Sequence, residues 1–217
     1  MTEKMLIAEN LTKSFGSRTV IDKLSFSLKQ TERLAIIARS GAGKTTLLRI
    51  FAGLEQPDHG SAKIATNSTA FLFQEARLFP FLTVEENILL PYKAQKRSFQ
   101  VEDQKALQTW LKVGGLLPFT RYYPYQLSGG MKKKTALIRA LLGKPELIFM
   151  DEPFHSIDRQ SVQNIVQFMS SFNANATLLL VSHNMEEINQ MADTVLVFEK
   201  DNLSHPQLKN NYLKTFS

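Results

Sequence analysis

The sequence predicts an α/β fold: a mainly parallel β-sheet covered by helices, an antiparallel β subdomain at the N-terminus, and a helical insertion in the middle. Three observations support this prediction. Several apolar runs are short and nearly continuous, as in strands buried on both faces. Near the N-terminus, apolar and polar residues alternate instead, which is typical of a half-buried strand. The middle of the chain has neither pattern.

The N-terminal pattern is clearest where Leu24, Phe26 and Leu28 alternate with polar residues. A period of two residues predicts a strand with one solvated face. Together with residues 5–15, this strand predicts an antiparallel patch at the start of the chain. The runs that predict strands buried on both faces cover residues 34–38, 70–73, 147–150, 177–182 and 194–198.

The middle block predicts helices. Thr83 and Glu86 have the spacing of a capping box that opens a helix, and Pro91 is expected to end it. A second helix is expected over residues 101–113, ended by Gly114 and Gly115. We therefore expect a single domain over residues 1–217, with a helical subdomain at about 75–127 inserted in the α/β core. The polar last residues predict only a short terminal element.

Composition excludes several kinds of protein. The chain has 217 residues and no cysteine, so disulfides and thiolate chemistry are excluded. No run approaches the roughly 18 apolar residues of a membrane-spanning helix, and the first ten residues lack the apolar core of a signal peptide. The net charge of +6 weakly favours acidic partners such as nucleotide phosphates, membrane headgroups or nucleic acid.

Residues 38–46 read ARSGAGKTT, between an apolar strand and a helical pattern. This is the P-loop pattern in its proper context, so the predicted core is that of a P-loop NTPase. The glycines let backbone N–H groups converge on phosphate oxygens, the lysine can reach the β- and γ-phosphates, and the hydroxyl of Thr45 can bind Mg²⁺. Ala38 stands where the pattern has its first glycine. The predicted phosphate-binding residues are Arg39, Ser40, Gly41, Ala42, Gly43, Lys44, Thr45 and Thr46.

Residues 147–153, LIFMDEP, deliver two carboxylates to the end of a buried strand. Ligands bind at strand ends in α/β folds. We expect Asp151 to hold Mg²⁺, through a water molecule, and Glu152 to polarise the attacking water.

Residues 127–130, LSGG, open another helix with a serine and two glycines. Such a terminus can bind phosphate. One active site has no evident need for a second anion site of this kind. The arrangement makes sense if Ser128, Gly129 and Gly130 close over the nucleotide of another subunit.

In the order and spacing of these segments, the chain resembles the ATP-binding cassette (ABC) ATPases, closest to the nitrate, sulfonate and taurine branch of bacterial importers. LSGG resembles their signature motif, which completes the partner's ATP site in a head-to-tail dimer. The resemblance implies that Phe15 stacks on adenine, that Asp158 links the two sites, and that His183 contacts the γ-phosphate. It implies catalytic roles for Lys44, Gln74, Glu152 and His183, and metal contacts from Thr45, Gln74 and Asp151.

The resemblance implies an ATP-hydrolysing motor subunit that uses ATP and Mg²⁺ at the cytoplasmic face of the cell membrane. Its implied partners are a second copy of itself, transmembrane permease subunits and, indirectly, an extracytoplasmic solute-binding protein, but no nucleic acid. No C-terminal regulatory domain is expected, since the chain stops at Ser217. The permease would dock on an apolar cluster formed by Leu78, Phe79, Phe81 and Leu82.

Several alternatives stay open. The chain could be a soluble ABC ATPase that acts on ribosomes or DNA, or a regulatory subunit that hydrolyses poorly, which the departures at Ala38 and Met131 motivate. The apolar cluster could simply pack the helical insertion on the core. Residues 132–134, three lysines in the first turns of the signature helix, are favoured as a solvated face; nearby phosphates or acidic groups would make them easier to accommodate.

Overall fold

The structure is a computed structural model that describes residues 3–94, 98–198, 202–204 and 207–210. The chain divides into two compact units. The first, here called the sheet unit, comprises Met1–Phe71, Glu146–Asp151 and Asn175–Ser217. The second, the helical unit, comprises Leu72–Pro145 and Glu152–Ala174. The expected insertion at 75–127 lies within the helical unit, which also includes later segments of the chain.

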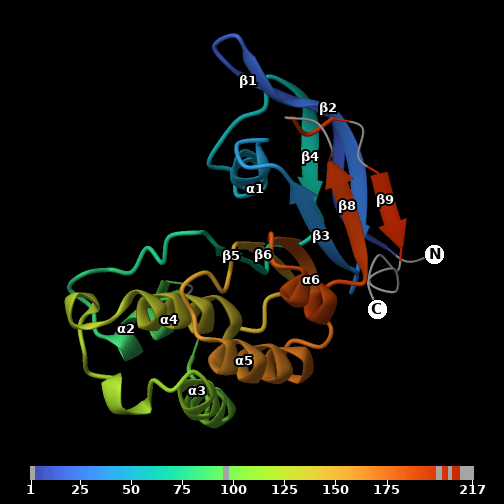
Figure 1. The fold of residues 1–217 in the computed structure, drawn as a ribbon. Coiled ribbons are helices and arrows are strands. Elements are labelled where there is room, and N and C mark those ends of the chain that lie inside the picture. Colours follow the sequence, from blue (N-terminus) through green and yellow to red (C-terminus); the bar gives the residue numbers. More distant parts are fainter. Residues whose placement is uncertain (1–2, 95–97, 199–201, 205–206, 211–217) are drawn as a thin grey trace. The chain divides into compact units, whose positions relative to one another are not determined.

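The antiparallel sheet of the sheet unit has the strand order β2-β1-β4 (Figure 1). Its strands are β1 (Lys4–Phe15), β2 (Arg18–Lys29) and β4 (His59–Ile64). Both β2 and β4 pair with β1 in antiparallel fashion, with Leu6 opposite Leu28 and Leu11 opposite Leu24. The predicted N-terminal antiparallel patch is therefore confirmed, and β4 adds a strand that was not predicted.

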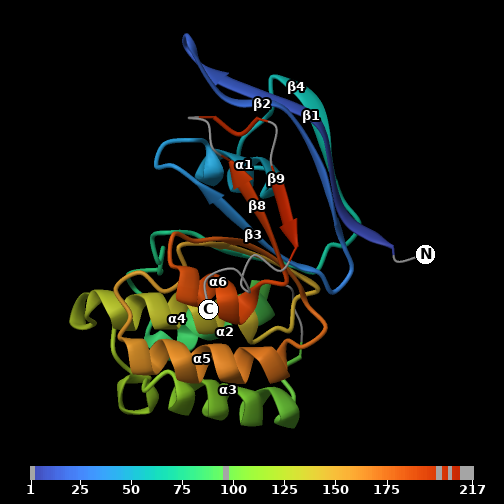
Figure 2. The same cartoon turned by 45° about the vertical axis from the view of Figure 1, so that its right-hand side comes forward.

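The second sheet has the strand order β5-β6-β7-β3-β8-β9 (Figures 1 and 2). Its strands are β3 (Arg33–Ala38), β5 (Thr69–Leu72), β6 (Leu147–Asp151), β7 (Thr177–Val181), β8 (Thr194–Phe198) and β9 (Gln207–Asn210). β3 pairs in parallel with β7 and β8, and β6 pairs in parallel with β7. β9 pairs with β8 in antiparallel fashion. Every residue of β6 and β7 is buried, as the continuous apolar runs predicted.

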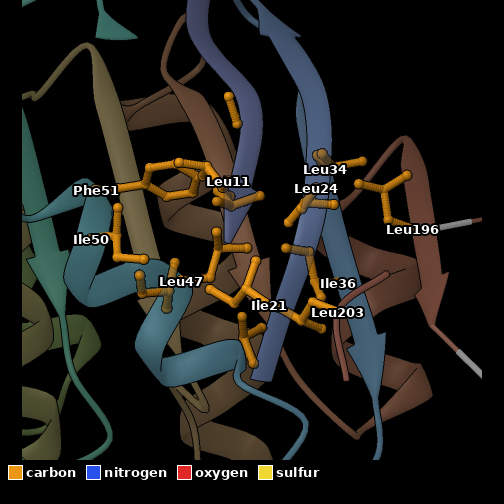
Figure 3. Close-up of a cluster of buried hydrophobic side chains, with 14 of the residues drawn as sticks. Leu11, Ile21, Leu24, Leu34, Ile36, Leu47, Ile50, Phe51, Leu196 and Leu203 are labelled. Carbon is orange, nitrogen blue, oxygen red and sulfur yellow. The ribbon is translucent and has the colours of Figure 1, made fainter. Parts of the chain in front are cut away.

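The core of the sheet unit surrounds helix α1 (Lys44–Phe51). Figure 3 shows Leu47, Ile50 and Phe51 of this helix in one cluster with residues of both sheets. The ring of Phe149 stacks on that of Phe51 at 5.7 Å between centroids. Burial of each large apolar side chain stabilises the fold by about 1.5–3 kcal/mol. Helix α1, which begins at Lys44, is therefore anchored in the core of the sheet unit.

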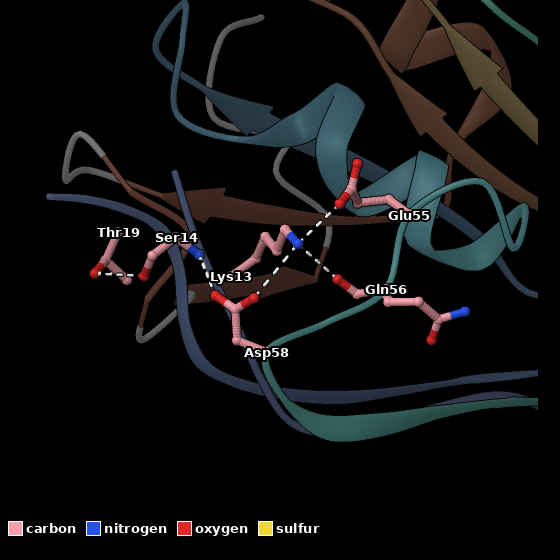
Figure 4. A network of polar contacts seen from close by, with 6 residues as sticks. All are labelled: Lys13, Ser14, Thr19, Glu55, Gln56 and Asp58. Atoms are coloured by element: carbon pink, nitrogen blue, oxygen red, sulfur yellow. Dashed lines mark hydrogen bonds and ion pairs between the residues drawn. The ribbon is translucent and has the colours of Figure 1, made fainter. Parts of the chain in front are cut away.

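A polar network pins the end of β1 to the segment that follows α1 (Figure 4). Lys13 Nζ lies 2.8 Å from Glu55 Oε1 and 3.4 Å from Asp58 Oδ1, and it donates to the carbonyl oxygen of Gln56 at 2.8 Å. The backbone N–H of Ser14 donates to Asp58 Oδ2 at 2.7 Å. This hydrogen bond, together with the Lys13 ammonium, lowers the pKa of Asp58. We call this network the polar clasp.

The helical unit contains α2 (Val84–Ala94), α3 (Val101–Val113), α4 (Gly129–Leu141) and α5 (Arg159–Phe172). α2 packs against α4, and α3 packs against α5. Trp110 of α3 is fully buried, with edge-to-face contacts to Phe168 and Phe172 of α5 at 4.7 and 5.6 Å between centroids. These rings join segments that are far apart in the sequence. A further helix, α6 (Met185–Met191), belongs to the sheet unit.

The helical predictions are confirmed except at Pro91. The backbone N–H of Thr83 donates to Glu86 Oε2 at 2.9 Å and the N–H of Glu86 donates to Thr83 Oγ1 at 3.3 Å, which is the predicted capping box. The expected end at Pro91 is wrong, because α2 continues to Ala94. Proline removes one backbone donor but need not end a helix that packing supports. Tyr92 supplies such packing, since it is buried and its hydroxyl donates to Asp103 Oδ1 at 2.9 Å.

Within the part of the chain that the structure describes, no helix is both long and apolar enough to cross a lipid bilayer.

Candidate functional site

The P-loop of the sheet unit connects β3 to α1 and is held by its own lysine. Lys44 Nζ donates to the carbonyl oxygens of Ala38 at 2.7 Å and Arg39 at 2.8 Å. These bonds fold the loop around the lysine side chain, which is buried. The ammonium is therefore held against the residues that open the predicted phosphate-binding loop.

The glycines of this loop adopt backbone conformations that other residues rarely adopt. Gly41 has φ of 75° and Gly43, the N-cap of α1, has φ of 102°. A Cβ atom on Gly43 would lie 2.7 Å from the carbonyl oxygen of Val20, so no side chain fits there. Ala38, by contrast, is the buried last residue of β3 and does not have a positive φ. The alanine in place of the first glycine is therefore compatible with the loop.

The predicted metal-binding pair of the sheet unit comes together in the structure. Thr45 Oγ1, at the start of α1, donates to Asp151 Oδ2, at the end of β6, at 2.6 Å. The two residues are far apart in the sequence and meet because β6 ends beside the P-loop helix. A hydroxyl and a carboxylate are the kind of oxygen donors that Mg²⁺ prefers. The donor set therefore fits the predicted ion.

The β1–β2 hairpin reaches the P-loop through a residue that the sequence reading missed. Arg18 pairs with Phe15 across the hairpin, and its Nη2 donates to the carbonyl oxygen of Gly41 at 3.0 Å. Phe15 is 51% exposed, as a ring that stacks on a base must be. Lys13 Nζ lies 5.3 Å from the centroid of that ring, a cation–π contact. Its place opposite Phe15 in a hairpin was the only signal for Arg18.

His183 follows β7 in the sheet unit and is exposed. The segment after it is fixed, since the backbone N–H of Asn184 donates to Ser182 Oγ at 3.0 Å and Ser182 Oγ donates to Glu187 Oε2 at 2.6 Å. Hydrogen bonds of Ser182 and Asn184 therefore hold the backbone on both sides of His183.

In the helical unit, the LSGG segment begins α4 as predicted. Ser128 is the N-cap, and its Oγ accepts from the backbone N–H of Met131 at 3.2 Å. Gly130 lies so close to another segment that a Cβ atom would sit 2.6 Å from the carbonyl oxygen of Ser156. Gly129 has nothing within 4 Å of the same position. One glycine thus allows a close backbone approach, and the other leaves the helix terminus open.

The three lysines after this turn have different environments. Lys133 is buried, and its Nζ donates to the carbonyl oxygens of Phe73 at 2.8 Å and Gln74 at 2.7 Å. Lys134 Nζ donates to Ser161 Oγ at 3.3 Å and lies 3.8 Å from Asp158 Oδ2. The favoured reading of residues 132–134 as a solvated face is therefore wrong for Lys133, which carbonyl groups accommodate instead.

The remaining predicted residues of the helical unit lie at turns. Gln74 is exposed on the segment that Lys133 holds. Asp158 is the N-cap of α5, and its pKa is lowered because its carboxylate accepts from the backbone N–H of Ser161. Glu152 has φ of 46°, which is uncommon for a residue with a side chain. Such strain is concentrated at functional sites, so the conformation is in keeping with a role for Glu152.

Exposed aromatic rings gather in the helical unit around a cavity of about 420 Å³, lined by Pro80, Phe81, Tyr123 and Tyr125. Phe81 is 89% exposed, and the rings of Tyr123 and Tyr125 stack at 5.9 Å. Of the predicted apolar cluster, Phe79 and Phe81 are exposed, whereas Leu78 and Leu82 are half-buried. The tyrosines extend this surface and were missed, because a single Tyr-rich stretch does not show which face its rings take.

Comparison with known proteins identifies the family. The sequence description of the ABC transporter family matches residues 21–155. The chain belongs to this family. It is 38% identical to the aliphatic sulfonates import ATP-binding protein SsuB 2 of Pseudomonas syringae pv. tomato, over 85% of this chain and 78% of that protein. It is 31% identical to a probable sulfate/thiosulfate import ATP-binding protein CysA of Chlorella vulgaris, over 97% of this chain and 96% of that protein.

Solved structures of ABC proteins share the fold. The ATP-binding cassette MJ0796, solved as a dimer in a post-hydrolysis state bound to ADP and Pi, superposes with a TM-score of 0.81 at 25% identity and covers 94% of this chain and 98% of its own. The predicted family and the P-loop α/β fold are confirmed. The comparisons also agree with the prediction of an ATP-binding and ATP-hydrolysing subunit, whereas the roles of individual residues stay predictions.

Proposed function

We propose that this ABC protein is the ATP-hydrolysing motor subunit of an importer of a small solute. One observation carries the proposal: the P-loop closes on its own lysine, and the next residue, Thr45, meets Asp151 at 2.6 Å. This is the arrangement needed to hold a nucleoside triphosphate together with a divalent cation. Relatives at 31–38% identity are named as import proteins, which supports the direction of transport.

The chemistry then follows from the chain's own residues. Lys44 binds the β- and γ-phosphates, Thr45 and Asp151 hold Mg²⁺, and Phe15 stacks on the adenine ring. Bound Mg²⁺ supplies positive charge that offsets the charge of the phosphates. Glu152 accepts a proton from the attacking water and orients it. By the family resemblance, His183 would contact the γ-phosphate and Gln74 would contact Mg²⁺, so catalysis is mainly positioning and charge stabilisation.

We further propose that two copies associate head to tail. In this arrangement Ser128, Gly129 and Gly130 close over the nucleotide of the partner, with Asp158 linking the two sites. The open helix terminus at Gly129 supports this reading, because its backbone N–H groups suit an anion that the same subunit does not provide. The dimeric state of the solved cassette MJ0796 is in keeping with it. ATP would hold the dimer closed and hydrolysis would release it.

The output of this motion would be passed to a permease, with the protein peripheral at the cytoplasmic face of the membrane. The exposed rings around the cavity of Phe81, Tyr123 and Tyr125 form an apolar surface that fits an apolar element of a permease. An extracytoplasmic solute-binding protein would act indirectly, through that permease.

The proposal is tested by measuring ATP binding and hydrolysis. We expect the purified wild type to bind and hydrolyse ATP–Mg²⁺, and Lys44→Ala to lose more than about 2 kcal/mol of binding free energy, roughly thirtyfold in affinity, because a buried charged partner of the phosphates is removed. Calorimetry and phosphate release measure the two effects. Lys63→Ala, which removes an exposed lysine of β4, is the matched control.

Unchanged ATP affinity in Lys44→Ala would refute the role of the P-loop. Tight binding without hydrolysis, even with a permease present, would favour the poorly hydrolysing regulatory subunit. Co-purification with ribosomes or DNA rather than with a membrane protein would favour the soluble ABC ATPase.

A further inference from the structure

Lys133 is a buried cation in the helical unit whose side chain is bound by backbone carbonyl groups. It is 3% exposed, and Nζ donates to Phe73 O at 2.8 Å and to Gln74 O at 2.7 Å. Transfer of an ammonium group out of water is costly unless hydrogen bonds replace its hydration. Charge-assisted bonds to carbonyl groups do so here. An apolar side chain would fill the same space without the cost of removing an ammonium group from water. The buried charge of Lys133 therefore needs an explanation.

The segment that Lys133 binds lies after β5 and has no regular secondary structure, so its carbonyl groups need other partners. A second side chain of α4 also donates hydrogen bonds to these carbonyl groups. Arg139 donates to Ala76 O and Arg77 O, both at 3.1 Å, and burial lowers the pKa of this guanidinium. Residues 73–77 are therefore fixed to α4 through cations.

Lys133 occupies a particular place on α4. It lies three residues after Gly130, so the two residues are neighbours on one face of the helix. Gly130 in turn lies directly against the Ser156 carbonyl group, where not even a methyl group fits. The same face of α4 is thus close-packed against Ser156 at Gly130 and, one turn later, bonded to the backbone of Gln74 through Lys133. We therefore expect a displacement of the LSGG turn to move the Gln74 backbone with it, because Lys133 links the two through buried hydrogen bonds.

We propose that Lys133 is a positioning residue for Gln74: it ties the backbone of this glutamine to the N-terminal part of α4, one turn after the LSGG segment, so that closure of the LSGG turn on a nucleotide is transmitted to the Gln74 side chain. This inference rests on the proposed function, in which both groups act on nucleotides. Lys133 itself touches no nucleotide in this scheme. It acts on the rate of hydrolysis through the placement of Gln74.

The test compares Lys133→Met with Lys132→Met in the full-length protein. Both changes replace a lysine of α4 by an unbranched apolar side chain, but Lys132 makes no side-chain hydrogen bond within the described part of the chain. We expect Lys133→Met to lower kcat for ATP hydrolysis by about tenfold to a hundredfold, as small misplacements of catalytic groups do. ATP affinity should stay within about twofold of the wild type, because the Lys44 site is intact. Lys132→Met should change neither.

A second readout does not depend on catalysis. Hydrogen exchange of the backbone amides at residues 73–77, without nucleotide, should accelerate in Lys133→Met and not in Lys132→Met. Lys133→Arg retains donors at this position and should recover part of both kcat and protection. Lys133→Met could also lower the melting temperature. Recovery of kcat and protection in Lys133→Arg would then show that the effects come from the lost hydrogen bonds to Phe73 and Gln74, and not from general destabilisation.

A double-mutant cycle with Gln74→Ala decides between positioning and a merely structural role. If Lys133 acts through Gln74, Lys133→Met should have no further effect on kcat once Gln74 is alanine. Additive effects, or exchange at 73–77 that equals the wild type, would overturn the inference. A wild type that neither binds nor hydrolyses ATP would instead overturn the proposed function, while the exchange measurement would still report on the tie itself.

Discussion

Asp58 of the polar clasp makes the stability of the sheet unit depend on pH. Its pKa is lowered first by the hydrogen bond from the Ser14 N–H, then by the Lys13 ammonium, and also by the nearby His59. A carboxyl group whose pKa is lower in the folded chain stabilises the fold above its unfolded pKa of about 4. That contribution is lost as the pH falls through the folded pKa, which lies lower.

We therefore expect Asp58→Asn to melt below the wild type at pH 7, and the difference to shrink as the pH falls below about 4. Melting curves at several pH values between 7 and 3 measure it. Glu9→Gln, which neutralises an exposed carboxylate of β1, serves as the control. A difference that stays constant or widens toward low pH would show that the charge of Asp58 does not stabilise the fold.

Individual site residues could be predicted where they lie within a contiguous motif. Lys44 and Thr45 could be proposed because the P-loop pattern specifies both the residue types and the spacing. Arg18 and Lys133 could not, because each acts on a segment distant in the sequence, Gly41 and Gln74 respectively. Helical spacing places Lys133 on the face of the buried Leu137 and Leu141, but nothing in the run of three lysines shows which segment its ammonium binds. That is decided only when α4 packs against the segment after β5.

At the scale of elements, the beginning of α4 places different demands on its two glycines. A methyl group on Gly130 would meet a backbone oxygen at 2.6 Å, and a backbone group cannot turn aside. We expect Gly130→Ala to destabilise the helical unit by about 1–3 kcal/mol, as overpacking does. Gly129→Ala should be neutral or stabilise by up to about 1 kcal/mol, because its site is open and alanine favours helix.

Urea unfolding followed by circular dichroism measures both variants. Both variants should also lose ATPase activity if the glycine turn contacts a nucleotide. Gly129→Ala should therefore lose activity without losing stability. Equal stability of the two variants would mean that the approach of Gly130 to Ser156 does not constrain the fold.

Elements were predictable where a single local signal dominates. The buried strands and the helix at 101–113 could be predicted, because the apolar runs mark the strands and the paired glycines mark the end of the helix. β4 was missed because its sequence, HGSAKI, lacks both alternation and an apolar run, and pairing with β1 alone makes it a strand. Pro91 misled because local propensity gave way to the packing of Tyr92.

At the scale of the whole molecule, the proposed mechanism predicts a change of oligomeric state. Glu152→Gln keeps the size of the side chain but cannot accept a proton from water, so hydrolysis should stop with ATP bound. We expect this variant to elute as a dimer from a sizing column with saturating ATP, and as a monomer with ADP. The Lys44→Ala, Glu152→Gln double variant should stay monomeric, since it lacks tight ATP binding. A monomeric single variant under saturating ATP would contradict the head-to-tail dimer.

The extent of the helical unit could not be predicted from the sequence. The pattern indicated an insertion near 75–127, whereas the unit also takes in residues 128–145 and 152–174. α5 belongs with α3 because Phe168 and Phe172 close around Trp110. Contacts over such sequence distances leave no periodic trace in either segment.

The same aromatic group gives this protein a built-in optical label. Trp110 is the sole tryptophan of the chain, and it is fully enclosed within the helical unit. Tryptophan fluorescence, excited at the red edge of the absorption band, therefore reports on the helical unit alone. Circular dichroism of the peptide groups reports on both units. Following the two signals side by side during denaturation would reveal whether the sheet-rich part melts in step with its helical neighbour or independently of it.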